Sequence, residues 1–153
     1  MNAIKSHAAT AVNMNNVFRM SHAGCIACGN EQQNPLALGL VFKIMADDTV
    51  SCRYQVQEHH QGYHGVLHGG VAAILVDSAM VNWLQLHGID DAMTAELNLR
   101  YHQALPVGDL VDIEAKLVQH RHKIYQLEAT LSVTQQPKVN ATAKFIQSTE
   151  LTT

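Results

Sequence analysis

The stretch HQGYHGVLHGGVAAILVDSAMVNWLQLHG, residues 60–88, decides the fold. If its second half forms a helix, almost every face of that helix is apolar. This half contains one carboxylate, Asp77. The apolar run, residues 71–86, is shorter than the ~20 residues that span a bilayer, and polar residues interrupt it. We predict no membrane span but a surrounded core helix that starts behind His68 and ends at Gly88, a residue suited to the C′ position.

Alternating apolar residues on both sides of this helix predict about six strands. Before the helix, residues 36–44 and 50–56 alternate with period two around a turn at 47–49, which is typical of a β-hairpin. After it, four further segments alternate within residues 97–101, 111–117, 125–133 and 139–145, with breaks at 106–108, 119–123 and 135–137. The order predicts an α+β fold, in which a curved antiparallel sheet wraps around one long central helix.

Composition describes an ordinary globular chain. Its 153 residues suit one domain with a real core, and 47% of them are hydrophobic. The formal net charge of −3 gives no sign of a nucleic-acid partner. Three cysteines, an odd count, and no secretory apolar segment after the first residues favour a reducing, cytoplasmic location.

The first part of the chain is the least regular. Residues 1–34 are predicted to form a partly irregular N-terminal arm, with a weak helix signal over Ala9 to Met20. Residues 35–150 are predicted to form the folded domain.

Two features of the long helix suggest chemistry. Gly69 and Gly70 lie at its start behind His68, a candidate N-cap, where unpaired N–H groups and the helix dipole attract an anion or a developing oxyanion. A Gly-Gly pair can also merely end a loop. Asp77 lies among apolar residues, where a carboxylate gains basicity. It can also be a structural acid that bonds a neighbouring hydroxyl or a loop N–H.

The spacing of these two features predicts an oligomer. Asp77 follows Gly70 by seven residues, about 20° off the same face but ~10 Å further along the axis. An antiparallel copy of the helix could bring its own Asp77 beside this Gly70. We therefore predict a homo-oligomer with shared sites, either a dimer or a dimer of dimers.

The residues resemble a known family. The segment HGG with the acid at Asp77, the preceding HQGYHGVL, CIACGNEQQNPLALGL at 25–40 and AELNLRYHQALPVGD at 95–109 are similar to hotdog-fold acyl-CoA thioesterases. The similarity is greatest to phenylacetate-pathway thioesterases and mammalian thioesterase-superfamily proteins. It covers roughly residues 25–145 and implies a hotdog domain over 35–150.

The resemblance implies roles for individual residues. Gly70 would donate its N–H to the thioester carbonyl, and Asp77 would act as general base or as nucleophile through a mixed anhydride. Thr94 matches the family's Ser or Thr at the start of the next strand and would orient water or the acid. His68 would shape the pocket near the thioester. Family members often carry Asn or Gln six residues before HGG, where this chain has Gly62.

Further residues are predicted to contact substrate, and no cofactor or metal is predicted. Gln61 beside Gly62, Gly69 at the helix start and His64 near the pocket mouth are the candidates around HGG. Arg121, His122 and Lys123, at a predicted hairpin, could meet the phosphates of coenzyme A, although a charged turn is also an ordinary solvated feature.

Two apparent metal motifs are discounted. Cys25 and Cys28 form only half of a zinc site. His60, His64 and His68 would align only on a helix, which the glycines at 62 and 65 disfavour.

The sequence thus predicts a hydrolase that cleaves acyl-CoA to free acid and coenzyme A. Two alternatives stay open. One is a hotdog enoyl-thioester hydratase or dehydratase, which would need an acid and a histidine placed to shuttle protons. The other is a non-catalytic acyl-CoA-binding protein with the same pocket.

Overall fold

The computed structural model describes residues 22–148, which form two compact units, 22–41 and 42–148. The predicted helix over Ala9 to Met20 lies outside the described residues. The division between the units falls after Val41, whereas the sequence predicts a boundary after Asn34.

The first unit corrects the predicted first strand. Residues 36–42 alternate in sequence but form turns and irregular backbone. Of the predicted strand 36–44, only Lys43–Ile44 (β1) is a strand. Gly39 has φ of 66°, which breaks an extended run. The N–H groups of Leu38 and Leu40 donate to the carbonyls of Ile26 and Ala27 within the same unit. These local bonds satisfy the backbone groups that the predicted hairpin would have used.

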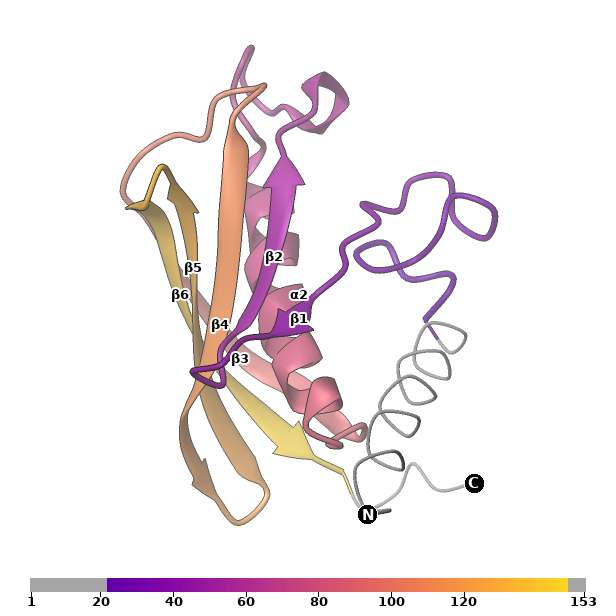
Figure 1. Ribbon diagram of the computed structural model, residues 1–153, viewed down its shortest axis with the longest axis vertical. Helices are drawn as coiled ribbons and strands as arrows, with labels where there is room; N and C mark the ends of the chain where they lie inside the picture. Colours follow the sequence, from indigo (N-terminus) through magenta and orange to yellow (C-terminus); the bar gives the residue numbers. More distant parts are fainter. Residues whose placement is uncertain (1–21, 149–153) are drawn as a thin grey trace, which may run out of the picture. The chain divides into compact units, whose positions relative to one another are not determined.

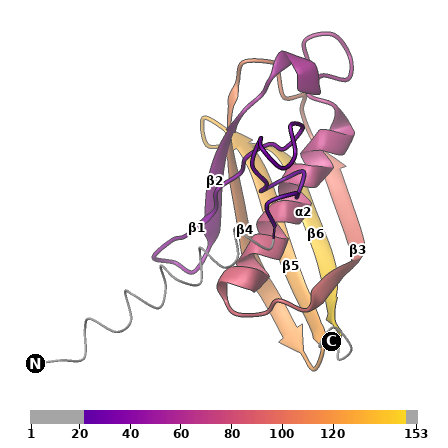
Figure 2. The same ribbon diagram turned by 90° about the vertical axis from the view of Figure 1, so that its right-hand side faces the viewer.

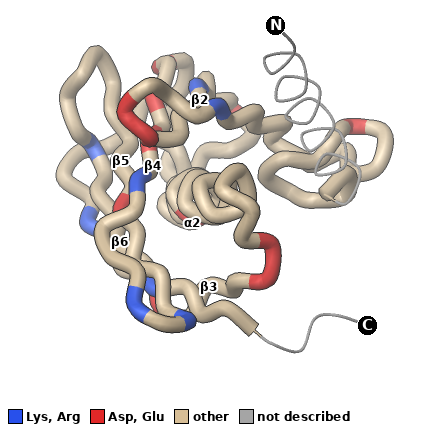
Figure 3. The backbone as a smooth tube through the Cα atoms, turned by 60° about the horizontal axis from the view of Figure 1, so that its bottom comes forward, with Lys and Arg blue, Asp and Glu red and all other residues tan. Residues whose placement is uncertain are grey.

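The second unit has the predicted order of elements (Figures 1 and 2). Its elements are β1, β2 (Val50–Gln55), the 3₁₀ turn η1 (Glu58–His60), α2 (Gly69–Leu86), β3 (Ala92–Tyr101), β4 (Leu110–Arg121), β5 (Ile124–Val133) and β6 (Gln136–Gln147). The six strands form one antiparallel sheet in the order β1-β2-β4-β5-β6-β3. Figure 3 shows this sheet curving around α2. The predicted hotdog architecture is confirmed.

The core lies between the concave face of the sheet and one side of α2. Alternate residues of β4, β5 and β6 point inward and are buried, as the period-two patterns predict. They meet a buried helix face that includes Leu75, Val76, Ala79, Met80 and Leu84. Charged residues that face each other on neighbouring strands form ion pairs. Lys116 of β4, for example, lies 3.0 Å from Glu128 of β5.

The sheet covers one side of α2 more fully than the other. Val71, Ile74, Asp77 and Val81, on the side away from the buried face, are only half-buried. The sheet can cover only one side of a cylinder, so the other side of α2 is left for other contacts. By length and composition alone α2 could cross a membrane, with mean hydropathy 1.3, but core helices pass the same test.

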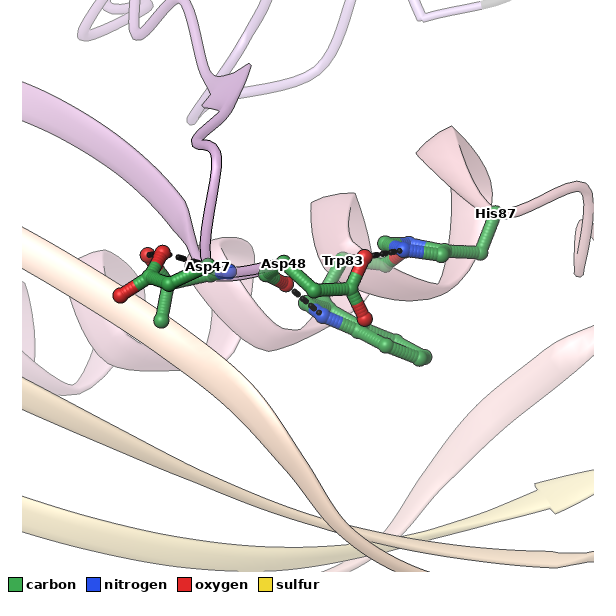
Figure 4. A network of polar contacts seen from close by, with 5 residues as sticks. Asp47, Asp48, Trp83 and His87 are labelled. Carbon is green, nitrogen blue, oxygen red and sulfur yellow. Dashed lines mark hydrogen bonds and ion pairs between the residues drawn. The ribbon is translucent and has the colours of Figure 1, made fainter.

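The end of α2 is fastened to the β1–β2 turn (Figure 4). The Trp83 indole N–H donates to the Asp48 carbonyl at 2.8 Å, and His87 stacks on Trp83 with ring centroids 3.8 Å apart. The two ring nitrogens of His87 lie 2.6 Å from the Trp83 carbonyl and 2.7 Å from the Asp48 carboxylate. Gly88 follows with φ of 81°, so the predicted helix end is confirmed.

Replacement of Trp83 by Phe tests this anchor. Trp83→Phe leaves the Asp48 carbonyl without its donor and removes part of a buried ring, so the free energy of unfolding should fall by about 1–3 kcal/mol. Asp48→Asn alters only an exposed carboxylate and should cost less than about 1 kcal/mol. Urea unfolding measures both variants. A larger loss for Asp48→Asn than for Trp83→Phe would contradict the assignment.

Candidate active site

Asp77 is bonded by a hydroxyl from the neighbouring edge strand. It is the only charged residue of α2, and it is half-buried. The Thr94 hydroxyl of β3 donates to Asp77 Oδ1 at 2.8 Å. Burial raises the pKa of Asp77 above its ordinary value, and the Thr94 bond opposes this effect only in part. The result is a carboxylate more basic than an exposed one, with a hydroxyl fixed beside it.

A β-bulge turns Thr94 toward the helix. Thr94 pairs with Phe145 and Glu96 pairs with Lys144, so Ala95 between them has no partner on β6. Phe145 is a buried inward residue, and the extra residue places Thr94 on the same face as Leu97, Leu99 and Tyr101. Without the bulge, Thr94 would point to the opposite face of the sheet.

His68 caps α2, as predicted, and occupies the Gly70 N–H. His68 has extended backbone, and its Nδ1 accepts the Gly70 N–H at 2.8 Å. The predicted oxyanion donor is therefore bonded to an internal acceptor. Within residues 22–148, the Gly69 N–H has no acceptor. This first turn thus has one unpaired donor, Gly69, beside one that the imidazole covers.

The loop before the helix brings Gly62 against His68. A Cβ at Gly62 would lie 3.1 Å from His68 Cδ2 and 3.2 Å from its Cα. Gln61 uses its side-chain oxygen to accept the Gly65 N–H at 2.9 Å, so it braces the loop. His64 lies in this loop and is exposed.

One residue that sequence reasoning missed contacts the start of α2. The Tyr101 hydroxyl donates to the Gly69 carbonyl at 2.7 Å, and burial raises the pKa of this phenol. The available signal was its place in the alternating pattern of residues 97–101, which puts it on the face toward the helix.

Tyr101 and Gly69 also line an open pocket of about 320 Å³. The other residues that line it are mostly apolar: Val66, Leu67, Ala72, Ala104, Leu105 and Val139. Two polar residues, His102 and Gln103, also line it. Gly70 and Asp77 are not among its lining residues.

The predicted site residues form separate groups within the chain. His68, Gly69, Gly70 and Gly62 meet at the first turn of α2, whereas Asp77 and Thr94 meet about two turns further on. Arg121, His122 and Lys123 form the β4–β5 turn, at the opposite end of the sheet from the first turn of α2 (Figures 1 and 2).

The three cysteines are free thiols. The Cys25 sulfur accepts the Ala27 N–H at 3.4 Å inside the turn that Cys25 and Cys28 share. Among residues 22–148, no group of three or more His, Cys, Asp or Glu side chains is placed to hold a metal ion.

Comparison with known proteins agrees with this geometry. A helix inside a curved antiparallel sheet, with an acid in the helix and glycines at its start, defines a hotdog-fold protein. The sequence model of the thioesterase superfamily matches residues 64–139. This match, which covers about half of the chain, confirms the resemblance noted in the sequence.

Individual relatives are distant. Acyl-coenzyme A thioesterase THEM4 of Rattus norvegicus is 28% identical over 109 residues, which are 70% of this chain and 46% of that protein, so the match spans about half of the relative. A mutant of phenylacetic acid degradation protein PaaI from Thermus thermophilus superposes with TM-score 0.66 and 22% identity, covering 73% of this chain and 96% of that one. A hypothetical thioesterase with coenzyme A from Streptococcus pneumoniae gives TM-score 0.66 and 19% identity, covering 71% and 88%. These two structures show the shared fold.

The raised pKa of Asp77 predicts a pH-dependent stability cost. Above the ordinary value of 3.8 the unfolded chain ionises before the folded one does, so folding stability falls as pH rises until the raised pKa is passed. Asp77→Asn removes this cost and can still accept the Thr94 hydroxyl. We expect a higher melting temperature than wild type at pH 7, with the gap closing below pH 3.8.

Asp90→Asn is the control, because Asp90 is exposed. It should leave the difference from wild type independent of pH. A pH-independent effect of Asp77→Asn would contradict the assignment of this cost to burial.

Proposed function

We propose that this protein hydrolyses acyl-CoA thioesters to a free acid and coenzyme A. The observation that carries the proposal is the half-buried Asp77 carboxylate with the Thr94 hydroxyl bonded to it, on a helix that begins with His68-Gly69-Gly70. The match of residues 64–139 to the thioesterase superfamily model supports the reaction class. The names of the rat relative and the streptococcal structure support coenzyme A as the thiol.

Asp77 can act in hydrolysis in either of two ways. As a general base it takes a proton from water while the water oxygen attacks the carbonyl carbon. As a nucleophile it attacks that carbon itself and forms a mixed anhydride, which water then cleaves. In both, the carbonyl becomes an oxyanion, the C–S bond breaks as this oxyanion collapses, and the thiolate of coenzyme A takes up a proton. Thr94 orients the water or the carboxylate.

The site is completed by a second subunit in this proposal. Gly70 and Asp77 are ~10 Å apart along one helix axis, too far for both to act on one carbonyl. The half-buried outer side of α2 could pack against an antiparallel copy, so that Asp77 of one subunit faces Gly70 of the other. In the same arrangement, the site that uses the partner's glycines would also include the Arg121-His122-Lys123 turn. This turn is a candidate contact for the phosphates of coenzyme A.

The helix start must change its bonding when substrate arrives. His68 has to release the Gly70 N–H before this group can donate to the oxyanion. The unpaired Gly69 N–H lies beside it and supplies a second donor of the same kind. Gln61 and His64 then act through the loop that supports His68.

The proposal requires no metal or redox cofactor, because a base, a hydroxyl and N–H donors suffice for hydrolysis. We also propose a reducing, cytoplasmic setting, with which three free thiols are consistent.

Thiol release from a panel of acyl-CoAs tests the reaction. The panel should include short, long, branched and aromatic acyl groups. With the best substrate, Asp77→Asn should lower kcat by at least about 10²-fold because the base or nucleophile is lost. Thr94→Ala should lower it roughly 10-fold, the effect of one hydrogen bond to a charged group.

Asp90→Asn serves as the matched control and should retain wild-type turnover. Absence of thiol release by wild type would refute the thioesterase proposal. An absorbance change with an enoyl-CoA but no thiol would favour a hydratase, and saturable binding without turnover would favour a binding protein.

Shared sites predict complementation between two inactive variants. Gly70→Pro removes the N–H in the first helical turn, where proline is tolerated. Co-refolded with Asp77→Asn, it should restore about a quarter of wild-type activity, because half of random dimers are mixed and each mixed dimer has one intact site. No recovery in demonstrated mixed dimers would place Gly70 and Asp77 of one subunit in one site. Wild-type activity of Gly70→Pro by itself would remove Gly70 from the site.

A further inference from the structure

Tyr101 touches the start of α2 in two ways. Its hydroxyl donates to the Gly69 carbonyl at 2.7 Å. Its ring lies beside the same glycine: a Cβ added at Gly69 would lie 3.5 Å from Tyr101 Oη and 3.6 Å from Cζ, in ordinary van der Waals contact. Both contacts come from the last residue of β3, 32 positions further along the chain.

The bonded carbonyl belongs to the peptide group that carries the Gly70 N–H. A peptide group is planar, so a bond that orients its carbonyl also orients its N–H. A donor on the carbonyl oxygen also polarises the amide and strengthens the N–H as a donor. On the other side, His68 Nδ1 accepts this N–H at 2.8 Å. One peptide group is therefore held from both ends, by Tyr101 and by His68.

We propose that Tyr101 is a positioning residue that aims the Gly69–Gly70 peptide at the oxyanion. The inference rests on the proposed thioesterase function. Tyr101 acts through the peptide and not on the substrate, and when His68 releases the Gly70 N–H, the phenol bond keeps the plane of the peptide in place.

The surroundings of Tyr101 suit this role. Its backbone is fixed by pairing with Val139 of β6, and its hydroxyl is held by the bond to the Gly69 carbonyl. Tyr101 is 52% exposed, so its side chain contributes little to the core. Burial of the phenol end raises its pKa above the ordinary value of 10.0, so the hydroxyl is a proton donor at neutral pH with or without this shift.

Tyr101→Phe tests the inference because it removes one oxygen and keeps the ring. For acyl-CoA hydrolysis we expect kcat to fall roughly 10-fold, as for loss of one hydrogen bond, with KM within about twofold of wild type. Tyr63→Phe is the matched control: Tyr63 is 90% exposed and should leave both constants unchanged.

A second readout does not depend on activity. The ¹⁵N resonance of the Gly70 amide should move upfield in Tyr101→Phe, because the preceding carbonyl loses a donor, whereas Tyr63→Phe should leave it in place. Melting temperatures of both variants identify any loss of fold.

The outcomes separate the two proposals. A wild-type kcat in Tyr101→Phe, an unmoved Gly70 resonance, or a loss confined to KM or to melting temperature would overturn the positioning role and leave the thioesterase proposal intact. Failure of the wild-type protein to cleave any thioester would overturn the proposed function, and the positioning role with it, even where the Gly70 resonance moves.

Discussion

The hydrogen bond from Thr94 to Asp77 is the constraint on which the site depends. A carboxylate on an otherwise uncharged helix loses much of its hydration, and a polar partner must replace part of that loss. The partner comes from β3, and it points at the helix only because Ala95 is left unpaired. The register of an edge strand therefore sets the environment of the acid.

β3 also fixes the rotation of α2, which apolar packing alone does not fix. Contacts between the sheet and Leu75, Ala79 or Met80 bury area but are not directional, so they hold α2 in place better than they fix its rotation. Hydrogen bonds from β3 reach α2 at Asp77 and at Gly69, about two turns apart. Two directional bonds from one strand fix both the rotation of the helix and the relative positions of its acid and its first turn.

Sequence periodicity predicted the strands that have one face toward the core and one face toward solvent. The alternation in residues 111–117 and 139–145 predicted inward faces correctly, because every second residue is buried except Leu117, which is half-buried. The same pattern failed at residues 36–42, where Gly39 and local backbone bonds prevail over alternation. The Ala95 bulge and the Tyr101 bond were not predictable, because each depends on a partner distant in sequence.

Gly62 explains a departure from the family pattern that sequence alone could only note. The family resemblance implies Asn or Gln at this place, but here a Cβ would lie 3.2 Å from the His68 Cα and 3.1 Å from Cδ2 of its ring. His68 in this position turns its Nδ1 onto the Gly70 N–H. The absence of a side chain at Gly62 therefore leaves the space that the His68 imidazole needs in order to cap the helix. His68 fills the space beside the helix start, and its ring satisfies the Gly70 N–H.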